Sequence, residues 1–362
     1  MLSMQSERPT PFLARARLAR PLHHDGYPHS LALAVIPCKT AARVRSGYIS
    51  ERRSMHSDST HTILQLASEL ENFHELARSL AVPQGEIPYV DGIDIFGGTL
   101  PLSGSLGGDL IVYLDFKQVF DLDARIRQAL EAGRQDVVAN LRACQRKAGI
   151  AVVDISGHRV TDAFLAATLH QGLLIGAVYE LDMSGQVTKR LFENLNTRFY
   201  QSWADNRFAS LIYGEISDDG RFEFLSAASP HPLVFSRRYD RFMEVGQDLC
   251  VSSPPLGIVP SRHVTDGNKT SSVLGFKEDY TVNQWVLMGE GDILLLHTDG
   301  LAEHRRGRDP YCPARLEGAL REVKDRSARE IFEAVTADLR SFSEPKDDIS
   351  LVVLRRTRRR DF

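Results

Sequence analysis

Aspartate recurs at four widely separated turns of this 362-residue chain, each beside a short apolar run. The turns are Gly107–Asp109, Asp154–His158, Thr298–Gly300 and Asp347–Ser350, and three of them lie at the ends of predicted strands. Hard divalent cations prefer oxygen ligands, which carboxylates supply. One such turn would mean little, because aspartate beside glycine is most often a plain turn. Four in one chain favour a metal-dependent hydrolase whose fold brings distant segments together.

Composition bounds the class of protein. The chain is 43% hydrophobic and 25% charged, which is ordinary for a soluble globular protein of one large domain or two smaller ones. A net charge of -3 creates no field that would attract nucleic acid or an anionic membrane, so we expect neither partner. The apolar run Leu31–Ile36 is far shorter than the roughly 20 residues of a membrane span, and no other segment is expected to span one.

The chain has four cysteines, and none of them show CxxC spacing. A disulfide framework or a thiolate zinc site is therefore not expected, and a cytoplasmic location fits.

Charge and proline content divide the chain into segments. Residues 1–55 hold nine Arg or Lys against three acids, with five prolines that break any long helix. Such a leader can be a transit peptide, but a disordered tail or a true start at Met55 is favoured. We expect a helical linker over 56–85, one globular domain over 86–356 and a basic tail over 357–362.

A helix is predicted over residues 62–80. Thr62–Gln65 has the form of a capping box, and apolar residues from Ile63 to Leu80 follow heptad spacing for about two and a half repeats. This length is below what a coiled coil requires. An amphipathic helix lying on its own domain and the seam of a homodimer both remain open, with control of activity as a further possibility. Pro83 ends the helix.

Between residues 86 and 356 the pattern predicts a single α+β unit. Strands are predicted at Gly92–Gly97, Leu110–Phe116, Ile150–Ile155, Ala209–Ile216, Arg221–Ala227, Asp292–Thr298 and Ile349–Leu354. Helices are predicted at Leu122–Lys147, Ala163–Leu181, Gly185–Asp205, Arg315–Lys324 and Ala328–Phe342, the last capped by Ser327 with Glu330. Asp219-Gly220 predicts a tight turn. Strands, then helices, then strands favour two packed, mainly antiparallel sheets flanked by helices.

The order of the motifs carries a family resemblance. Between the second and third aspartate turns stand Ser226–Leu233, which is similar to an Asn-Ala-Gly-His-x-Pro-x-Leu segment, and the Pro-Leu-Gly turn at Pro255–Ile258. With these, the chain resembles the SpoIIE/RsbU-type branch of the PP2C-like metal-dependent serine/threonine phosphatases. The likeness covers about residues 86–356, three quarters of the chain. It implies the αββα sandwich of those enzymes.

The resemblance also implies a site. Family members hold two Mn²⁺ or Mg²⁺ ions between two sheets, and a water that bridges the metals attacks the phosphorus. The positions that match the metal ligands are Asp109, Asp154, Asp299 and Asp347, with the backbone carbonyl of Ile155. Among these, Asp154 matches the bridging ligand. Asp154, Asp299 and Asp347 are the expected catalytic residues, acting through metal-bound water.

Neighbouring side chains have competing interpretations. His158 could donate a proton to the leaving oxygen or hydrogen-bond a metal-bound water, and a supporting structural role is favoured. Ser156 has no accompanying base that would make it a nucleophile. Asp348 is expected to be a solvated or hydrogen-bonding neighbour of the ligand beside it. His231 is expected to be a loop residue, and Asp115 could replace an acid of the family, although its offset differs.

The chemistry has a reason that is independent of the family. Phosphate monoesters carry two negative charges and hydrolyse extremely slowly without a catalyst. Two cations about 3.5–4 Å apart neutralise that charge and lower the pKa of bound water. Glycines beside the acids let the backbone and a phosphate approach closely.

Three features depart from the family pattern. Arg159 stands where glycine is usual, as a surface residue or as a fork for phosphate. Residues 117–148 form an insertion that could be a lid, a substrate dock or a regulatory element near the metal site. Ser226–Ser229 lacks the usual Asn and Gly.

The expected function is that of a cytoplasmic protein-serine/threonine phosphatase, dependent on two Mn²⁺ or Mg²⁺ ions. Its expected substrate is a phosphorylated regulatory protein, such as an anti-anti-sigma-like factor. Two alternatives remain: a catalytically degenerate scaffold or binding module, and a small-molecule phosphomonoesterase.

Overall fold

The computed structural model describes residues 63–69, 71–72, 75, 86–102, 108–156, 160–202, 207–263, 269–286 and 288–357. The chain divides into two compact units, Met1–Gln65 and Leu66–Phe362, and the fold below is that of the second. Residues 63–69, 71–72 and 75 are helical, in agreement with the predicted helix over 62–80 where that helix is described. The leader 1–55 and residues 358–362 lie outside the described residues, and the predicted domain boundaries stay predictions.

Two sheets form the centre of the described fold. One is five-stranded, in the order β1 (Ile93–Leu100), β13 (Ile349–Arg356), β10 (Ile293–His297), β6 (Leu233–Ser236) and β7 (Arg241–Phe242). The other runs β2 (Leu110–Leu114), β3 (Lys147–Ile155), β4 (Ala209–Ser217), β5 (Phe222–Ala227) and β8 (Ser252–Ser253), with β9 (Asn283–Trp285) also on β5. Every pairing within them except β5 with β8 is antiparallel, so the predicted sheet type is confirmed.

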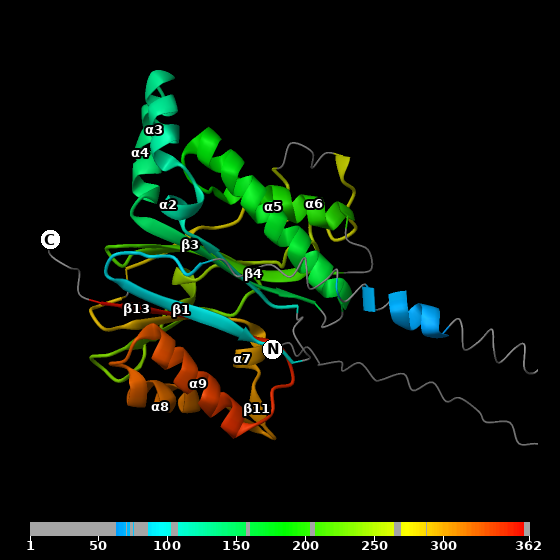
Figure 1. Cartoon of the computed structure of the whole chain (residues 1–362), viewed down its shortest axis with the longest axis vertical. Helices are drawn as coiled ribbons and strands as arrows, with labels where there is room; N and C mark the ends of the chain where they lie inside the picture. Colours follow the sequence, from blue (N-terminus) through cyan, green and yellow to red (C-terminus); the bar gives the residue numbers. More distant parts are fainter. Residues whose placement is uncertain are drawn as a thin grey trace, which may run out of the picture. The chain divides into compact units, whose positions relative to one another are not determined.

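Helices cover both outer faces of the sheet pair (Figure 1). The β2–β5 sheet carries α2 (Phe116–Val119), α3 (Leu122–Glu131), α4 (Gln135–Cys144), α5 (Val160–Ser184) and α6 (Lys189–Ser202). The β1–β13 sheet carries α7 (Asp299–Ala302), α8 (Ala314–Val323) and α9 (Ala328–Phe342). Shorter elements are the 3₁₀ helix η1 (Gln247–Leu249) and the hairpin of β11 (Arg305–Arg306) and β12 (Asp309–Pro310). The αββα sandwich expected from the resemblance is confirmed.

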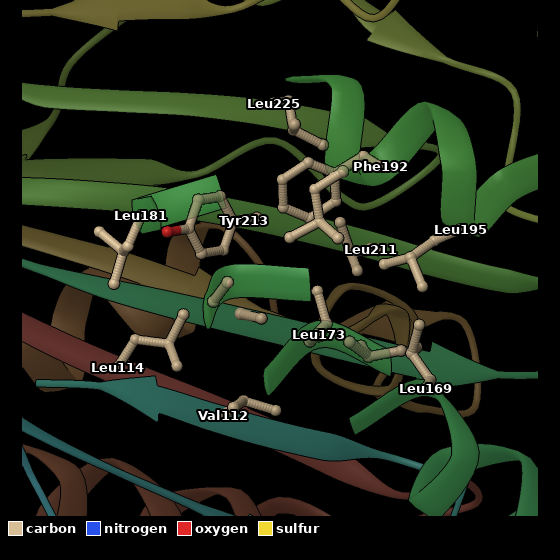
Figure 2. Packing of buried hydrophobic residues seen from close by; sticks show 14 of the residues in the cluster. Val112, Leu114, Leu169, Leu173, Leu181, Phe192, Leu195, Leu211, Tyr213 and Leu225 are labelled. Carbon is tan, nitrogen blue, oxygen red and sulfur yellow. The ribbon is translucent and has the colours of Figure 1, made fainter. Parts of the chain in front are cut away.

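Alternation along the strands separates the core into layers. In β3, Ile150 and Val152 pack between the two sheets, whereas Ala151 and Val153 pack against the helices on the other face. This is the period of two that a strand buried on both faces requires. Figure 2 shows the helix-covered layer, where Leu169 and Leu173 of α5 meet side chains from the sheet.

Helix α9 illustrates how sequence sets an element. The Ser327 side chain accepts from the Glu330 N–H while the Glu330 carboxylate accepts from the Ser327 N–H, so the predicted capping box and both helix ends are confirmed. Its buried residues, Ile331, Val335 and Leu339, repeat every four positions and form one apolar face.

The single helix predicted over Leu122–Lys147 is wrong. The chain forms two helices, because Gly133 adopts a φ of +70° that ends α3, and Lys147 already begins β3. The pair is a helical hairpin that joins the Leu114 end of β2 to the start of β3. Asp109 and Asp154 stand at the opposite ends of those strands. The insertion 117–148 therefore lies at the end of these strands remote from the candidate ligands Asp109 and Asp154, rather than near them as predicted.

Helix α5 contradicts the expectation that no segment of the chain is long and apolar enough to span a membrane. Within the described residues, Phe164–Ser184 is long and apolar enough to cross a membrane, and 44% of its most apolar window is buried. Leu169, Leu173 and Leu181 are packed inside the domain. Core helices of soluble proteins pass the same length test, so the helix alone gives little indication of a membrane.

Candidate metal centre

The first two acidic turns meet across adjacent strands. Leu110 of β2 pairs with Val153 of β3, so the residue before β2, Asp109, comes beside Asp154. The Ile155 N–H extends the ladder by donating to the Gly108 carbonyl at 3.3 Å. By strand alternation, both aspartates continue the row that faces the other sheet. Both are partly buried, so this pair of carboxylates lies at neighbouring ends of β2 and β3, on the side that faces the other sheet.

Thr298 joins the second sheet to this pair. It follows β10, and its hydroxyl donates to Asp109 Oδ2 at 2.8 Å. The Ser350 N–H in turn donates to Thr298 Oγ1 at 2.9 Å, and the Ser350 hydroxyl lies 2.6 Å from that of Thr99. The hydroxyls of Thr298 and Ser350, from one sheet, thus hold a carboxylate that belongs to the other.

Asp299 is the first residue of α7 and is partly buried. Burial raises its pKa above the usual value, and the nearby charges of Asp347 and then Glu303 raise it further. Gly300 permits the close packing at this point, because a Cβ there would lie 2.0 Å from the Asp348 carbonyl oxygen. The third and fourth acidic turns are therefore neighbours in space.

Asp348 connects the two pairs. It is only 3% exposed, and its carboxylate accepts from the Leu102 N–H at 2.7 Å and from the Gly108 N–H at 2.8 Å. Its own N–H donates to Asp347 Oδ1 at 2.9 Å. These contacts agree with its predicted role as a hydrogen-bonding neighbour, although it is buried rather than solvated. They fasten both ends of the segment 102–108.

Burial and repulsion between acids together raise carboxyl pKa values where these turns meet. The pKa of Asp109 is well above its usual value because of burial first and the charge of Asp154 second, with a smaller contribution from Asp348. Hydrogen bonds from Thr298 and Ser350 lower it but do not compensate. Carboxylates clustered in this way repel one another, and a hard divalent cation bound to their oxygens would remove that repulsion.

The ligand assignments nevertheless stay predictions. Among the residues that the structure describes, no group of three or more His, Cys, Asp or Glu side chains lies close enough to hold a metal ion. What the structure brings together is two pairs, Asp109 with Asp154 and Asp299 with Asp347. His158 lies outside the described residues, as do Gly107, Gly157 and Arg159.

Comparison with known proteins identifies the family. The family model for Stage II sporulation protein E (SpoIIE) matches residues 145–357, more than half of the chain. The chain belongs to the SpoIIE family. The match includes Asp154, Asp299 and Asp347 and begins after Asp109 and after most of the α3–α4 insertion.

Solved structures agree on the fold of this SpoIIE-family chain. The RsbU and RsbW domains of Rv1364c from Mycobacterium tuberculosis share 20% identity at a TM-score of 0.53, covering 75% of this chain and 61% of that one. The PP2C phosphatase domain of SpoIIE from Bacillus subtilis, with a fragment of its regulatory domain, shares 18% identity at a TM-score of 0.50, covering 74% and 64%. The chain thus spans less than two thirds of each of those two chains. No curated protein sequence matches it.

Arg207 was not anticipated from the sequence. It follows α6, forms an ion pair with the fully buried carboxylate of Asp162 near the start of α5, and donates to the Ser156 carbonyl at 2.9 Å. It therefore ties the turn after Asp154 to the helix that follows. Its partners are 45 and 51 positions away, and no local motif announces such a contact.

Three other sequence interpretations can be compared with the structure. Asp115 caps α2 by accepting from the Lys117 and Gln118 N–H groups at the far end of β2, so its assignment as a replacement site acid is wrong. Ser156 Oγ accepts from the Phe208 N–H at 3.2 Å, which suits a structural serine. His231 is exposed, as expected of a loop residue.

Proposed function

We propose that this SpoIIE-family chain is a metal-dependent protein phosphatase that hydrolyses phosphoserine or phosphothreonine on a regulatory protein. The observation that carries the proposal is the meeting of all four acidic turns at one end of the two sheets. Thr298 donates to Asp109 across the sheets, Asp154 raises the pKa of Asp109, and the fourth turn does the same to Asp299. The SpoIIE family match and the PP2C-like fold support the same reaction class.

Two Mn²⁺ or Mg²⁺ ions are the proposed cofactors. The residues that would hold them are Asp109, Asp154, Asp299 and Asp347, with the Ile155 carbonyl. When bound, such a pair of cations neutralises phosphate charge and lowers the pKa of its water towards neutrality. The carboxylates fit this role because they supply oxygen ligands and because a bound cation would offset their mutual repulsion.

The chain's own residues orient these groups. The Thr298 hydroxyl fixes the carboxylate of Asp109 through Oδ2. Asp348 anchors the segment before Asp109 through two backbone N–H groups, and Arg207 anchors the turn after Asp154 through the Ser156 carbonyl. His158 is proposed to support this site as a hydrogen-bonding residue or as a proton donor to the leaving oxygen.

The direct test is phosphate release from a phosphoprotein in the presence of Mn²⁺. Asp154→Asn should lower the rate by roughly 100-fold or more, because the amide keeps the shape but loses the charge of a ligand. Asp121→Asn is the matched control, since Asp121 caps the exposed start of α3 and asparagine caps a helix equally well. An unchanged rate for Asp154→Asn would refute the mechanism.

The substrate is proposed to be a phosphorylated regulatory protein in the cytoplasm, such as an anti-anti-sigma-like factor. One similar structure contains RsbU and RsbW domains in a single chain, and another is that of a cell-fate determinant. Rates on a phosphopeptide should exceed those on sugar and nucleotide monoesters. The reverse order would favour a small-molecule phosphomonoesterase.

A catalytically degenerate scaffold is the second candidate, and one observation favours it. The described residues include no group of three or more ligand-type side chains close enough to hold a metal. Calorimetry with Mn²⁺ separates the two candidates: an enzyme should bind Mn²⁺ in a manner that Asp299→Ala abolishes, whereas a scaffold should not.

We infer that the helix over residues 62–80 mediates a homodimer or controls activity, because its apolar residues follow heptad spacing. Deletion of residues 1–82 should reduce the number of protomers in the sedimenting species from two to one or change the rate. An unchanged number of protomers together with an unchanged rate would contradict the inference.

A further inference from the structure

A basic hairpin stands directly after the helix that carries Asp299. The Glu303 N–H donates to the Asp299 carbonyl at 2.7 Å and closes α7. The Tyr311 N–H then donates to the His304 carbonyl at 2.8 Å, which fixes the base of the β11–β12 hairpin. The hairpin therefore projects from the same short segment that supplies one of the candidate ligands.

The end of α9 braces this hairpin. The Ser343 hydroxyl donates to the Arg305 carbonyl at 3.2 Å and lies 3.1 Å from His304 Nε2. The Arg306 guanidinium lies 4.7 Å from the centre of the Phe342 ring. Since Ser343 precedes Asp347 by four residues, the hairpin and the segment that leads to the fourth acidic turn form one surface.

Positive charge gathers on this surface. Residues 303–310 and 340–346 are here named the basic rim. They contain three acids, Glu303, Asp309 and Glu344, and five bases, Arg305, Arg306, Arg308, Arg340 and Lys346. All eight of these residues are exposed. Five bases against three acids give the rim a net charge of +2, whereas the whole chain carries -3.

The exposed guanidinium groups can exchange partners. Arg306 lies 3.6 Å from Asp309, with side chains 61% and 64% exposed. Exposed pairs of this kind are worth at most about 1 kcal/mol and are screened by salt, so an incoming carboxylate can replace Asp309. Arginine also offers a planar fork that binds carboxylates and phosphates through two hydrogen bonds.

We propose that the basic rim is a docking surface for acidic residues that flank the phosphorylated serine or threonine of a protein substrate. This inference rests on the proposed phosphatase function and names its substrate class. The clustered site carboxylates repel an anionic substrate, and a rim of opposite sign beside them attracts it and steers it towards the site.

The experiment uses one phosphoserine peptide with acidic, neutral or basic flanks, and para-nitrophenyl phosphate as a substrate without flanks. Wild-type protein with Mn²⁺ should prefer the acidic peptide, less so at high salt. Arg306→Glu with Arg308→Glu should lower kcat/KM for the acidic peptide about 10-fold, while the rate on para-nitrophenyl phosphate stays within about 2-fold.

The matched control reverses the charge of two arginines on another hairpin, at β6 and β7. Arg238 and Arg241 are exposed on the β6–β7 hairpin, and β6 pairs with β10 so that its hairpin lies at the Ile293 end, away from Asp299. Arg238→Glu with Arg241→Glu changes net charge equally and should leave the acidic-peptide preference intact.

Fluorescence anisotropy of a labelled, unphosphorylated acidic peptide separates this inference from the phosphatase proposal. Binding that is lost in the Arg306→Glu, Arg308→Glu variant supports the basic rim, even if no substrate releases phosphate and the proposed function fails. Equal rates on acidic and neutral peptides, or equal losses in both double variants, would overturn the inference. Preferential binding of single-stranded RNA over every peptide would overturn it as well.

Discussion

At the scale of single residues, Gly300 decides whether the third and fourth acidic turns can meet. Gly300→Ala would place a Cβ 2.0 Å from the Asp348 carbonyl oxygen, so α7 and the start of β13 must separate. We expect a loss of about 1–3 kcal/mol in the free energy of unfolding, measured by urea denaturation, together with loss of phosphatase activity.

Gly318→Ala is the control for that substitution. Gly318 lies inside α8, and a Cβ there has nothing within 4 Å. The helix should gain about 0.5–1 kcal/mol, because alanine is the better helix former. Equal stability of the Gly300→Ala variant and the wild type would contradict the packing described at α7.

Arg207 gives a second residue-level prediction. Arg207→Ala removes a charged partner from the fully buried Asp162 and a donor from the Ser156 carbonyl. The free energy of unfolding should fall by about 2 kcal/mol. This is less than for a fully buried pair, because Arg207 is 28% exposed. Arg207→Lys should restore stability in part, since lysine keeps the charge but loses the fork. Thermal unfolding and phosphate release measure the two effects.

Arg190→Ala is the matched control for Arg207. Arg190 also pairs with a buried acid, Glu180, but it is 60% exposed, and the Thr188 hydroxyl remains as a donor to Glu180. Its loss should cost less than about 1 kcal/mol. If Arg207→Ala cost no more than Arg190→Ala and left the rate unchanged, Arg207 would have no positioning role.

The candidate ligands are easier to find in the sequence than the residues that support them. Aspartates beside glycine are visible as local motifs, and their pairing follows once the strands are recognised. Thr298 stands in one of those motifs, but its bond to Asp109 spans 189 positions and depends on how the two sheets face each other. The Asp162–Arg207 pair is equally non-local, so no spacing rule could have found it.

At the scale of elements, the α3–α4 hairpin holds the far end of α5. Arg134 donates to the Asp182 carbonyl at 2.9 Å and to the Met183 carbonyl, which are among the last carbonyls of the helix and lack intrahelical donors. Asn140 donates to the Ser184 carbonyl at 2.8 Å. The insertion thus caps the end of α5 that is remote from the acidic turns.

Arg134→Ala should therefore loosen that end without affecting the chemistry. We expect a loss of about 1 kcal/mol, faster hydrogen exchange in the last turn of α5, and a phosphatase rate within about 2-fold of wild type. Arg142→Ala, on the exposed side of α4, should change none of these. A large fall in rate for Arg134→Ala alone would show instead that the insertion controls the site through α5.

Element prediction succeeded where local signals were strong and failed where one residue overrode them. The capping box of Ser327 and Glu330 fixed the start of α9. Within Leu122–Lys147, apolar periodicity continues on both sides of Gly133, so the pattern predicts one helix. A positive φ at one glycine is enough to reverse the direction of the chain, and the spacing of apolar residues gives no sign of it.

At the scale of the whole molecule, two packed sheets bring distant segments of the chain together at one end. The layers were predictable, because strands with both faces apolar must be covered on both sides. The contact between the Asp109 turn and the Thr298 turn was not, since it depends on how the two sheets face each other.

The convergence of acids on a pair of cations is the central claim, and anomalous scattering at the manganese edge tests it most directly. Crystals grown in millimolar Mn²⁺ should give two peaks at the meeting point of Asp109, Asp154, Asp299 and Asp347, and the peak beside Asp299 should vanish in Asp299→Ala. Peaks elsewhere, or none among these four carboxylates, would contradict the account.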